Sequence, residues 1–243
     1  VTPLDNTYLS IRMGIRMKIV IKIGGSLLQD NDEINVERIS KYAEIIRTLR
    51  EEGHNLMIVV GGGNIARRYI EAMRKLDASD AICDLMGIKV AKLNAYLLVS
   101  AIKDHVYPKV PDTLEEAISI FSMGKIVVMG GLQPGQSTNA VAALLAESVK
   151  ADVFINATTV DGVYTAPPGT PGARKLEQVT AEELMKIMQE TSKFKAGEYR
   201  LFDPLAILIV QRAKLLVKIV DGRDPRNVLR AIRGEKIGTT LIP

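Results

Sequence analysis

The sequence predicts an α/β protein in three layers, with helices on both faces of a mostly parallel sheet. Five runs rich in isoleucine and valine alternate with helical segments, which is the pattern of a parallel sheet. The 243 residues, of which 47% are hydrophobic, suffice to bury a full core. The predicted strands are Lys18–Ile23, Leu56–Val60, Ile126–Met129, Val153–Ile155 and Leu215–Val220.

Capping residues mark the ends of several helices between these strands. Glycine accepts the left-handed backbone conformation that closes a helix, while aspartate and threonine side chains accept the free N–H groups at its start. A proline directly after the cap favours the first helical position. The expected caps are Gly53 and Gly124 at C-termini, and Thr180 with Glu183, Asp203 and Asp224 at N-termini.

A single domain is expected to span residues 17–243. Within it, proline, glycine and charge replace the periodic pattern at Thr165–Arg174 and at Thr191–Arg200, and we expect surface loops there. Because Met17 directly precedes the first strand, residues 1–16 are expected to be an N-terminal extension, either disordered or included by a misplaced start.

The composition argues against a metal site built by the protein. The chain has two histidines and one cysteine, too few for a zinc site, so any metal would arrive with its substrate, as magnesium does with a nucleotide. Cys83 lies in an apolar helical pattern and is expected to be a buried small side chain. A lone cysteine forms no internal disulfide, which agrees with a reducing compartment.

Charge and hydropathy favour a soluble protein that binds small anions. The net charge of +4 suits an anionic ligand, but aromatic residues are only 5% and no block of lysine and arginine typical of nucleic-acid binding occurs. The longest apolar runs, such as Leu205–Val210, are far shorter than the roughly 18 residues of a bilayer span. No secretory signal is recognisable. We therefore expect a cytoplasmic protein without membrane or nucleic-acid partners.

Glycine-rich or polar turns follow four of the predicted strands. They are "KIGGS" (Lys22–Ser26), "GGGNIARR" (Gly61–Arg68), "GGLQPGQST" (Gly130–Thr138) and "NATTVDGVY" (Asn156–Tyr164). In an open parallel sheet these turns share the carboxyl edge, where ligands bind. Glycine lets main-chain N–H groups face an anion, and the following helix adds its positive end. Four such turns predict a multiply charged ligand or two ligands.

The second turn also fits a dinucleotide-binding fingerprint. "GGGNIA" satisfies G-x-G-x-x-A, and the acidic residue Asp80 follows Gly61 by nineteen positions. A nicotinamide-binding unit requires that acid at the end of a second strand, yet the segment from Asn64 to Asp104 reads as helix throughout. An oxidoreductase is therefore disfavoured. A Walker A loop is absent too, so a phosphoryl-transfer enzyme would need another source of positive charge.

Two cations could supply that charge. Lys22 interrupts the apolar strand "IVIKIGG", which is costly unless the side chain faces the ligand edge of the sheet. The alternative is a lysine on an edge strand that faces solvent. Arg67 lies in the first turn of the helix after Gly61–Gly63, where it could clamp a phosphate, whereas its neighbour Arg68 could simply be solvated.

Taken in order and spacing, five motifs resemble the amino-acid kinase family, and within it the archaeal uridylate (UMP) kinases. They are "KIGGS", "VVGGGNIARRYI", "GGLQPGQSTNAVAALLAE", "TTVDGVYT" and "DPLAI", and the resemblance runs from Met17 to the C-terminus. It implies the amino-acid kinase-like fold, with an acceptor-nucleotide half at about 17–150 and an ATP half at about 151–243. It also implies that ATP phosphorylates UMP to UDP in pyrimidine nucleotide biosynthesis, with Mg²⁺ carried by the nucleotide.

The resemblance also implies roles for residues of the matching motifs. Lys22 would neutralise the transferring group, Asp161 would orient this machinery, and Arg67 would serve catalysis and the donor phosphates. Ser137 and Thr138 would supply hydrogen-bond donors to the acceptor. The other residues on the ATP side would be Gly24, Gly25, Ser26 and Gly63 at the phosphates, and Thr158, Thr159 and Tyr164 near the adenosine. Those on the UMP side would be Gly62 at the phosphate, Asp84 at the ribose, and Leu132, Gln133, Pro134, Gly135, Gln136, Ser137 and Thr138 around the uracil and phosphate.

Other members of the fold remain alternatives, namely acetylglutamate, aspartate, carbamate and isopentenyl phosphate kinases. The isopentenyl phosphate enzymes have a histidine shortly after their second glycine turn, where this chain has Asn64–Arg67. Its two histidines, His54 and His105, lie in a helix–strand turn and at a helix end, and are expected to be structural. A non-catalytic nucleotide-binding protein is a further alternative, although a pure binder has no need of a transition-state clamp that includes Lys22.

Two further features carry expectations of their own. The family usually has an aspartate three positions after the tyrosine of "DGVYT", where this chain has Pro167, so the donor site is expected to be weaker or to use main-chain carbonyls. The helical segment Ser79–His105 becomes nearly all apolar in "VAKLNAYLLVSAI". We expect this segment to pack against its symmetry mate in a dimer, which the resemblance extends to a hexamer.

Overall fold

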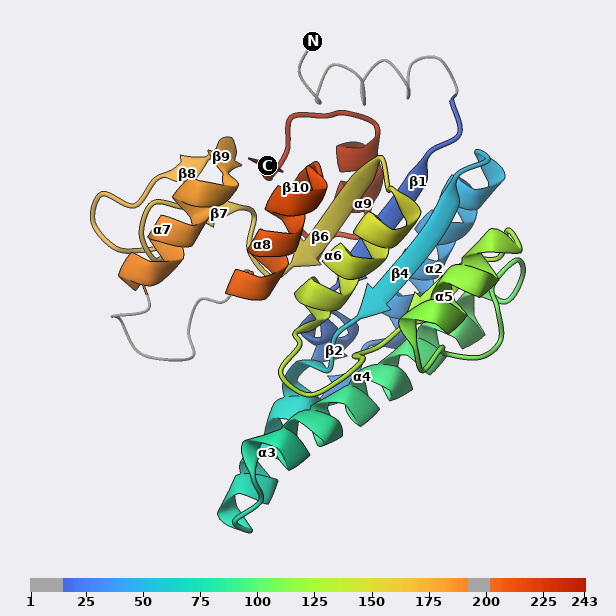
Figure 1. The fold of residues 1–243 in the computed structure, drawn as a ribbon, viewed down its shortest axis with the longest axis horizontal. Coiled ribbons are helices and arrows are strands. Elements are labelled where there is room, and N and C mark those ends of the chain that lie inside the picture. The colour runs from blue at the N-terminus through green and yellow to red at the C-terminus, as the bar shows by residue number, and fades with distance from the viewer. Residues whose placement is uncertain (1–14, 192–201) are drawn as a thin grey trace.

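The computed structural model describes residues 15–191 and 202–243. Its centre is a seven-stranded sheet in the order β5-β4-β1-β6-β10-β11-β9, with helices on both faces (Figure 1). All pairings in this sheet are parallel except that of β10 with β11. The predicted three-layer α/β/α fold around a mostly parallel sheet is confirmed. The expected extension at 1–16 and the expected loop at 191–200 fall almost entirely outside the described residues.

All five predicted strands are present, with small differences at their ends. They are β1 (Lys18–Ile23), β4 (Asn55–Val60), β5 (Val127–Met129), β6 (Val153–Thr158) and β10 (Val217–Asp221). The pattern of isoleucine and valine fits them because parallel strands in a three-layer fold are buried on both faces. The sequence did not predict the short strands β9 (Gln178–Thr180) and β11 (Thr239–Ile242), nor the hairpins of β2 (Gln29–Asp30) with β3 (Glu33–Ile34) and of β7 (Val163–Tyr164) with β8 (Lys175–Leu176).

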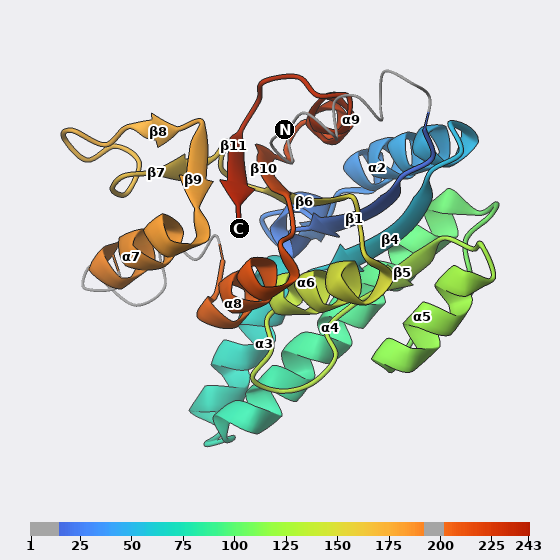
Figure 2. The same cartoon turned by 45° about the horizontal axis from the view of Figure 1, so that its top comes forward.

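The helices form two layers, one on each face of the sheet (Figure 2). Apolar side chains of α2, α4 and α9 pack on one face, and those of α5, α6, α7 and α8 pack on the other. A single turn of 3-10 helix, η1 (Gly25–Leu28), follows β1. The helices are α2 (Val36–Glu51), α3 (Gly63–Lys75), α4 (Asp80–Ile102), α5 (Leu114–Ser122), α6 (Thr138–Val149), α7 (Ala181–Thr191), α8 (Pro204–Ala213) and α9 (Arg226–Ile232).

The segment from Asn64 to Asp104, which was expected to be helical throughout, consists of two helices joined by a short turn. The chain turns between α3 and α4, where Asp77 adopts a left-handed conformation with φ 64°. The turn is sharp because the N–H of Ala78 donates to the carbonyl of Met73, and Ser79 then stands at the N-terminal cap of α4. The two helices project together from the sheet (Figure 1). The described segment contains no strand, as expected.

Most of the expected helix caps are confirmed. Gly53 and Gly124 have φ of 92° and 73°, the left-handed region in which glycine closes a helix. Thr180 and Glu183 exchange hydrogen bonds of 2.8 and 3.1 Å, which is a capping box. The prediction for Asp224 was wrong by one residue, because α9 begins at Arg226 and Pro225 occupies the cap position. The carboxylate of Asp224 still accepts the N–H of Arg226.

α4 has both a buried face and an exposed apolar face. Cys83 is buried, as predicted. By length and composition alone this 23-residue helix could cross a membrane, although one such helix is weak evidence for a span, and 39% of its apolar window is buried inside the fold. Scattered charges, such as Lys89, divide its apolar residues into short runs, so its length is not evident in the sequence. Its large exposed apolar side chains are Ile82, Leu85, Leu93, Tyr96 and Leu97.

Candidate active site at the carboxyl edge of the sheet

The first two glycine turns lie against each other at the carboxyl ends of β1 and β4. A side chain at Gly25 would place its Cβ 2.2 Å from the nitrogen of Gly63 and 2.3 Å from the oxygen of Gly61. Real Cβ atoms essentially never approach so closely, so the contact requires glycine at position 25. The N–H of Gly61 donates to the carbonyl of Ile23 at 3.0 Å and ties the turns together.

The second turn has the backbone geometry of an anion-binding nest. Gly62 is right-handed, with φ −77° and ψ −32°, and Gly63 is left-handed, with φ 71°. Successive residues of opposite hand turn their N–H groups toward one side, where an anion can bind. Among the described residues, neither the N–H of Gly62 nor that of Gly63 has a hydrogen-bond partner. The α3 helix that follows adds its positive end.

Lys22 occupies a central strand, so the alternative of an edge-strand lysine facing solvent is wrong. It pairs in register with Val59 of β4 and Asn156 of β6, and it is only 8% exposed. Alternation along β1 turns its side chain toward the layer of α6 and α8. Burial lowers the pKa of Lys22 to about 8, against the opposing charge of Asp203. A buried ammonium near the glycine turns is suited to neutralise an anion.

Asp203 and Ser137 join the N-termini of α8 and α6. The carboxylate of Asp203 accepts the hydroxyl proton of Ser137 and the N–H of Ala206, which caps α8. The oxygen of Ser137 accepts the N–H groups of Asn139 and Ala140, at 3.0 and 3.2 Å, which caps α6. The hydroxyl of Ser137, which the resemblance assigned to the acceptor nucleotide, therefore donates to Asp203 in this structure. Sequence reasoning identified Asp203 only as a cap.

Arg67 contacts the first glycine turn from α3. Its guanidinium donates to the hydroxyl of Ser26 at 2.9 Å and to the side-chain oxygen of Asn64. In the described part of the chain Arg67 has no carboxylate partner, so its charge is not neutralised. Arg68 differs, because it forms an ion pair with Asp32. The contact brings together two residues that the sequence assigned to the donor phosphates.

Asp161 lies on the loop after β6, among residues assigned to the ATP side. It accepts a hydrogen bond from Tyr164 at 2.9 Å and pairs with Lys175 at 3.2 Å. Burial alone would raise the pKa of Asp161, but these two partners outweigh it and hold the pKa below its usual range. Its partners are thus Tyr164 and Lys175, and the charge that faces Lys22 is that of Asp203. Lys175 lies in the unpredicted strand β8 and was not identified from the sequence.

The third turn, which the resemblance assigned to UMP, packs against α4. A Cβ at Gly130 would lie 2.7 Å from the nitrogen of Lys92, so the loop runs close to the helix backbone. The carboxylate of Asp84 accepts the N–H of Gly135 at 2.9 Å and links α4 to the tip of the loop. Gln136 has a buried side-chain oxygen that lacks a hydrogen-bond partner in the described chain. The hydroxyl of Thr138 borders the second turn, 3.5 Å from where a Cβ at Gly61 would lie.

The other residues that the resemblance assigned to the site lie at the ends of β1 and β6 and in the third turn. Gly24 follows β1, and its N–H donates to the carbonyl of Ala157 in β6 at 3.0 Å. The carbonyl of Thr158, the last residue of β6, accepts the N–H of Gly222 at 2.7 Å. Leu132 packs at the border of the core, whereas Gln133, Pro134 and Thr159 are exposed. No group of three histidine, cysteine, aspartate or glutamate side chains that could hold a metal ion occurs within 15–191 and 202–243.

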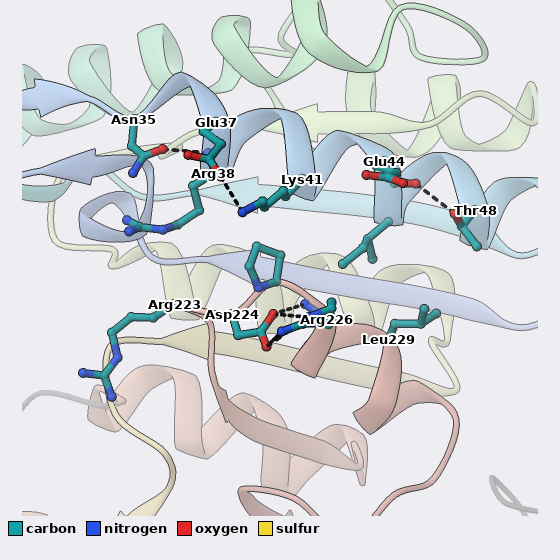
Figure 3. Close-up of a pocket in the computed structure, with 12 residues that line it drawn as sticks. Asn35, Glu37, Arg38, Lys41, Glu44, Thr48, Arg223, Asp224, Arg226 and Leu229 are labelled. Carbon is teal, nitrogen blue, oxygen red and sulfur yellow. Dashed lines mark hydrogen bonds and ion pairs between the residues drawn. The ribbon is translucent and has the colours of Figure 1, made fainter.

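A cavity of about 680 Å³ lies elsewhere, between α2 and the start of α9 (Figure 3). Its charged side chains largely neutralise one another, with Lys41 2.6 Å from Glu37 and Arg226 2.9 Å from Asp224. None of the residues that the sequence assigned to a site lines it. The glycine turns, where Arg67 has no acidic partner within the described residues, are therefore the better candidate site.

Residues 17–221 match the amino acid kinase family. The chain belongs to this family. The amino-acid kinase-like fold expected from the motifs is confirmed, and the region matched includes all four glycine-rich or polar turns.

Similar proteins extend over nearly the whole chain. A uridylate kinase from Methanothermobacter thermautotrophicus is 47% identical over 228 residues, which are 93% of this chain and 100% of the relative. A uridylate kinase from Methanobrevibacter smithii is 43% identical over 93% of this chain and 99% of the relative. The crystal structure of a uridylate kinase from Archaeoglobus fulgidus superposes with a TM-score of 0.83 at 40% identity, covering 93% of this chain and 100% of that one.

Proposed function

We propose that this amino-acid kinase transfers the γ-phosphoryl group of ATP to UMP, giving UDP and ADP. Full-length similarity to several archaeal uridylate kinases supports this substrate pair. The observation that carries the proposal is the position of Lys22, a buried cation at the edge where the glycine turns meet. We further propose a role in cytoplasmic pyrimidine nucleotide synthesis.

In this reaction an oxygen of the UMP phosphate attacks the γ-phosphorus, and the bond from that phosphorus to the ADP oxygen breaks. The chemistry requires positioning and charge neutralisation rather than covalent help from the protein. The N–H groups of Gly62 and Gly63 would hold phosphate oxygens, and Arg67 would hold the donor side. Lys22 would stabilise the charge that develops on the transferring group.

Magnesium would supply further neutralisation while held by the phosphates of the nucleotide. The nearby carboxylates fit this arrangement, because each already has a partner in the protein. Asp161 pairs with Lys175, Asp203 accepts from Ser137, and Asp221 pairs with Arg223. A metal held chiefly by these side chains would have to displace those contacts.

We also propose that the chain dimerises through α4, with a hexamer as the larger assembly. Ile82 and Leu85 are three positions apart, Leu93 follows Leu85 by eight, and Tyr96 and Leu97 follow Leu93 by three and four, so these exposed apolar residues of α4 share one face of the helix. Leu93, near the middle, is 65% exposed. The exposed Lys89 lies between Leu85 and Leu93 on this face. Exposed apolar side chains that gather on one face in this way are typical of a protein interface.

A coupled assay that follows ADP release tests the function directly. UMP, CMP, AMP and isopentenyl phosphate are offered in turn with ATP and Mg²⁺, and a reaction without acceptor measures background hydrolysis. UMP is expected to give the highest kcat/KM. If isopentenyl phosphate or an acyl acceptor matched UMP, the proposal would have to be abandoned in favour of another kinase of the same fold.

A further inference from the structure

Two buried amide side chains contact the second glycine turn, and neither was assigned to the site from the sequence. Asn94 of α4 and Gln29 of β2 are 2% and 3% exposed. The Asn94 amide donates to the carbonyls of Gly61 and Gly62 at 2.9 and 3.1 Å. Gln29 donates to the carbonyl of Gly62 at 3.2 Å. Both carbonyls of the turn are thereby held inside the protein.

Peptide geometry gives these contacts a consequence for the ligand side. In a trans peptide the carbonyl and the following N–H point in opposite directions. Fixing the carbonyls of Gly61 and Gly62 toward the two amides therefore directs the N–H groups of Gly62 and Gly63 away from them. Those are the two N–H groups that lack a partner in the described chain and that form the nest.

Gln29 has a second contact that limits where an anion can bind. Its side-chain oxygen accepts the N–H groups of Asn64 and Ile65, at 2.7 and 3.3 Å. It therefore caps α3, a task that Gly62 at the cap position cannot perform because it has no side chain. With these two N–H groups occupied, Gly62 and Gly63 are left to receive the ligand.

Three consecutive glycines are otherwise free to adopt many backbone conformations. We propose that Asn94 and Gln29 are positioning residues that hold Gly61–Gly63 in the phosphate-binding conformation. In the described chain, the hydrogen bonds of both side chains are with the backbone of this turn and of the first residues of α3. The identity of the phosphate, on UMP or on ATP, rests on the proposed function, whereas the clamp itself requires only that the nest binds an anion.

The test compares Asn94→Leu and Gln29→Met with the wild type. Each variant removes the amide contacts while keeping a buried side chain of similar size. Binding of UMP, ATP and inorganic tripolyphosphate is measured by calorimetry, and thermal unfolding is recorded in parallel. At least a tenfold rise in the Kd of an anionic ligand is expected for Asn94→Leu, which loses two hydrogen bonds to the carbonyls of the turn, and a smaller rise for Gln29→Met, which loses one such bond. KM is expected to rise by more than kcat falls.

Thr113→Ala provides the matched control for stability. The hydroxyl of Thr113 accepts the N–H of Glu116 at 3.1 Å and caps α5, so its loss lowers the midpoint of unfolding without touching the glycine turns. Its Kd values are expected to equal those of the wild type. An effect of destabilisation alone would appear in this control too.

The outcomes separate this inference from the proposed function. If the wild type binds tripolyphosphate but not UMP, and the variants lose tripolyphosphate, the clamp holds and the UMP assignment fails. If folded Asn94→Leu and Gln29→Met bind every anion as tightly as the wild type, the clamp is refuted. A wild type that binds none of the three ligands overturns the inference as well. Should Asn94→Leu not fold, Gln29→Met alone decides between these results.

Discussion

Replacing Lys22 with methionine is expected to raise the stability of the protein while it abolishes most of the activity. The side chain is 8% exposed, and burial lowers the pKa of Lys22 from 10.5 to about 8 despite the nearby charge of Asp203. Desolvation of the ammonium therefore costs more than the carboxylate returns. Methionine keeps the length of the stem and fills the same space without a charge.

The expected gain follows from the lowered pKa. A shift from 10.5 to about 8 corresponds to about 3 kcal/mol against the charged form in the folded protein. Between these pH values the folded protein binds fewer protons than the unfolded chain, so wild-type stability rises with pH across that window. The variant has no such group. The free energy of unfolding of the variant is expected to exceed that of the wild type by at most about 3 kcal/mol below pH 8 and by close to zero above pH 10.5. The gain below pH 8 is reduced because Asp203 loses its positively charged neighbour.

Two assays check the prediction. Urea unfolding at pH 7 and at pH 10 measures the change in stability, and the coupled ADP assay with UMP measures turnover. Turnover is expected to fall by about 10²–10⁴ with nucleotide binding retained, since one preorganised charge is lost from the transition state. Lys18→Met, four positions earlier on β1 at an exposed site, is the control and is expected to retain normal turnover.

Either of two results would refute this reasoning. Near-normal turnover of Lys22→Met would remove the lysine from catalysis. Unfolding at a urea concentration no higher than that of the wild type at pH 7 would show that the buried ammonium is not penalised, and that the lowered pKa of Lys22 is not a result of desolvation.

Four further predictions address other parts of the structure. Asp203→Asn keeps a helix-capping side chain but removes the charge that raises the pKa of Lys22, so the alkaline fall of kcat/KM should move to lower pH. An unchanged pH profile would show that the charge of Asp203 does not affect the titration of Lys22. UMP should be used at least about ten times more efficiently than CMP, which requires only about 1.4 kcal/mol of discrimination; equal kcat/KM values would contradict this. Leu93→Glu should convert the proposed dimer into a species of about 27 kDa by light scattering, and a wild type already of that mass would disprove the interface. Pro167→Asp should lower the KM for ATP with little change in kcat, and an unchanged or higher KM would mean that the loop already serves the ribose.

The sequence predicted the elements whose residues carry their own local pattern. Buried parallel strands such as β1 are runs of isoleucine and valine, and their glycine turns follow directly. β11 was not predicted because it is four residues long and begins with two threonines, Thr239 and Thr240, so it lacks a run of isoleucine and valine. The position of the turn at Asp77 could not be predicted because no glycine or proline marks it, and the sequence does not show that an aspartate adopts a left-handed conformation.

The same division applies to the candidate site. Lys22 and the glycines could be found because a charge in an apolar strand and a cluster of glycines are each unusual locally. Asn94 and Gln29 could not, because their significance lies in contacts made 32 to 36 positions away along the chain. Asp203 was identified as a cap, but its contact with Ser137, 66 residues distant, depends on the packing of α6 beside α8.

The contrast between two glycines indicates where this scaffold can be redesigned. At Gly25 even one methyl group would collide with the backbone of the neighbouring turn, so every other residue type is excluded and a mutant library at this position would be wasted. At Gly135, at the tip of the third turn, no atom of the described chain beyond its sequence neighbours lies within 4 Å of the position that a Cβ would take, and the obstacle is its φ of 79°. Asparagine and aspartate tolerate that conformation best among the other residues. An attempt to admit a bulkier acceptor should therefore begin with asparagine or aspartate at position 135 and leave the first glycine turn, which contains Gly25, unchanged.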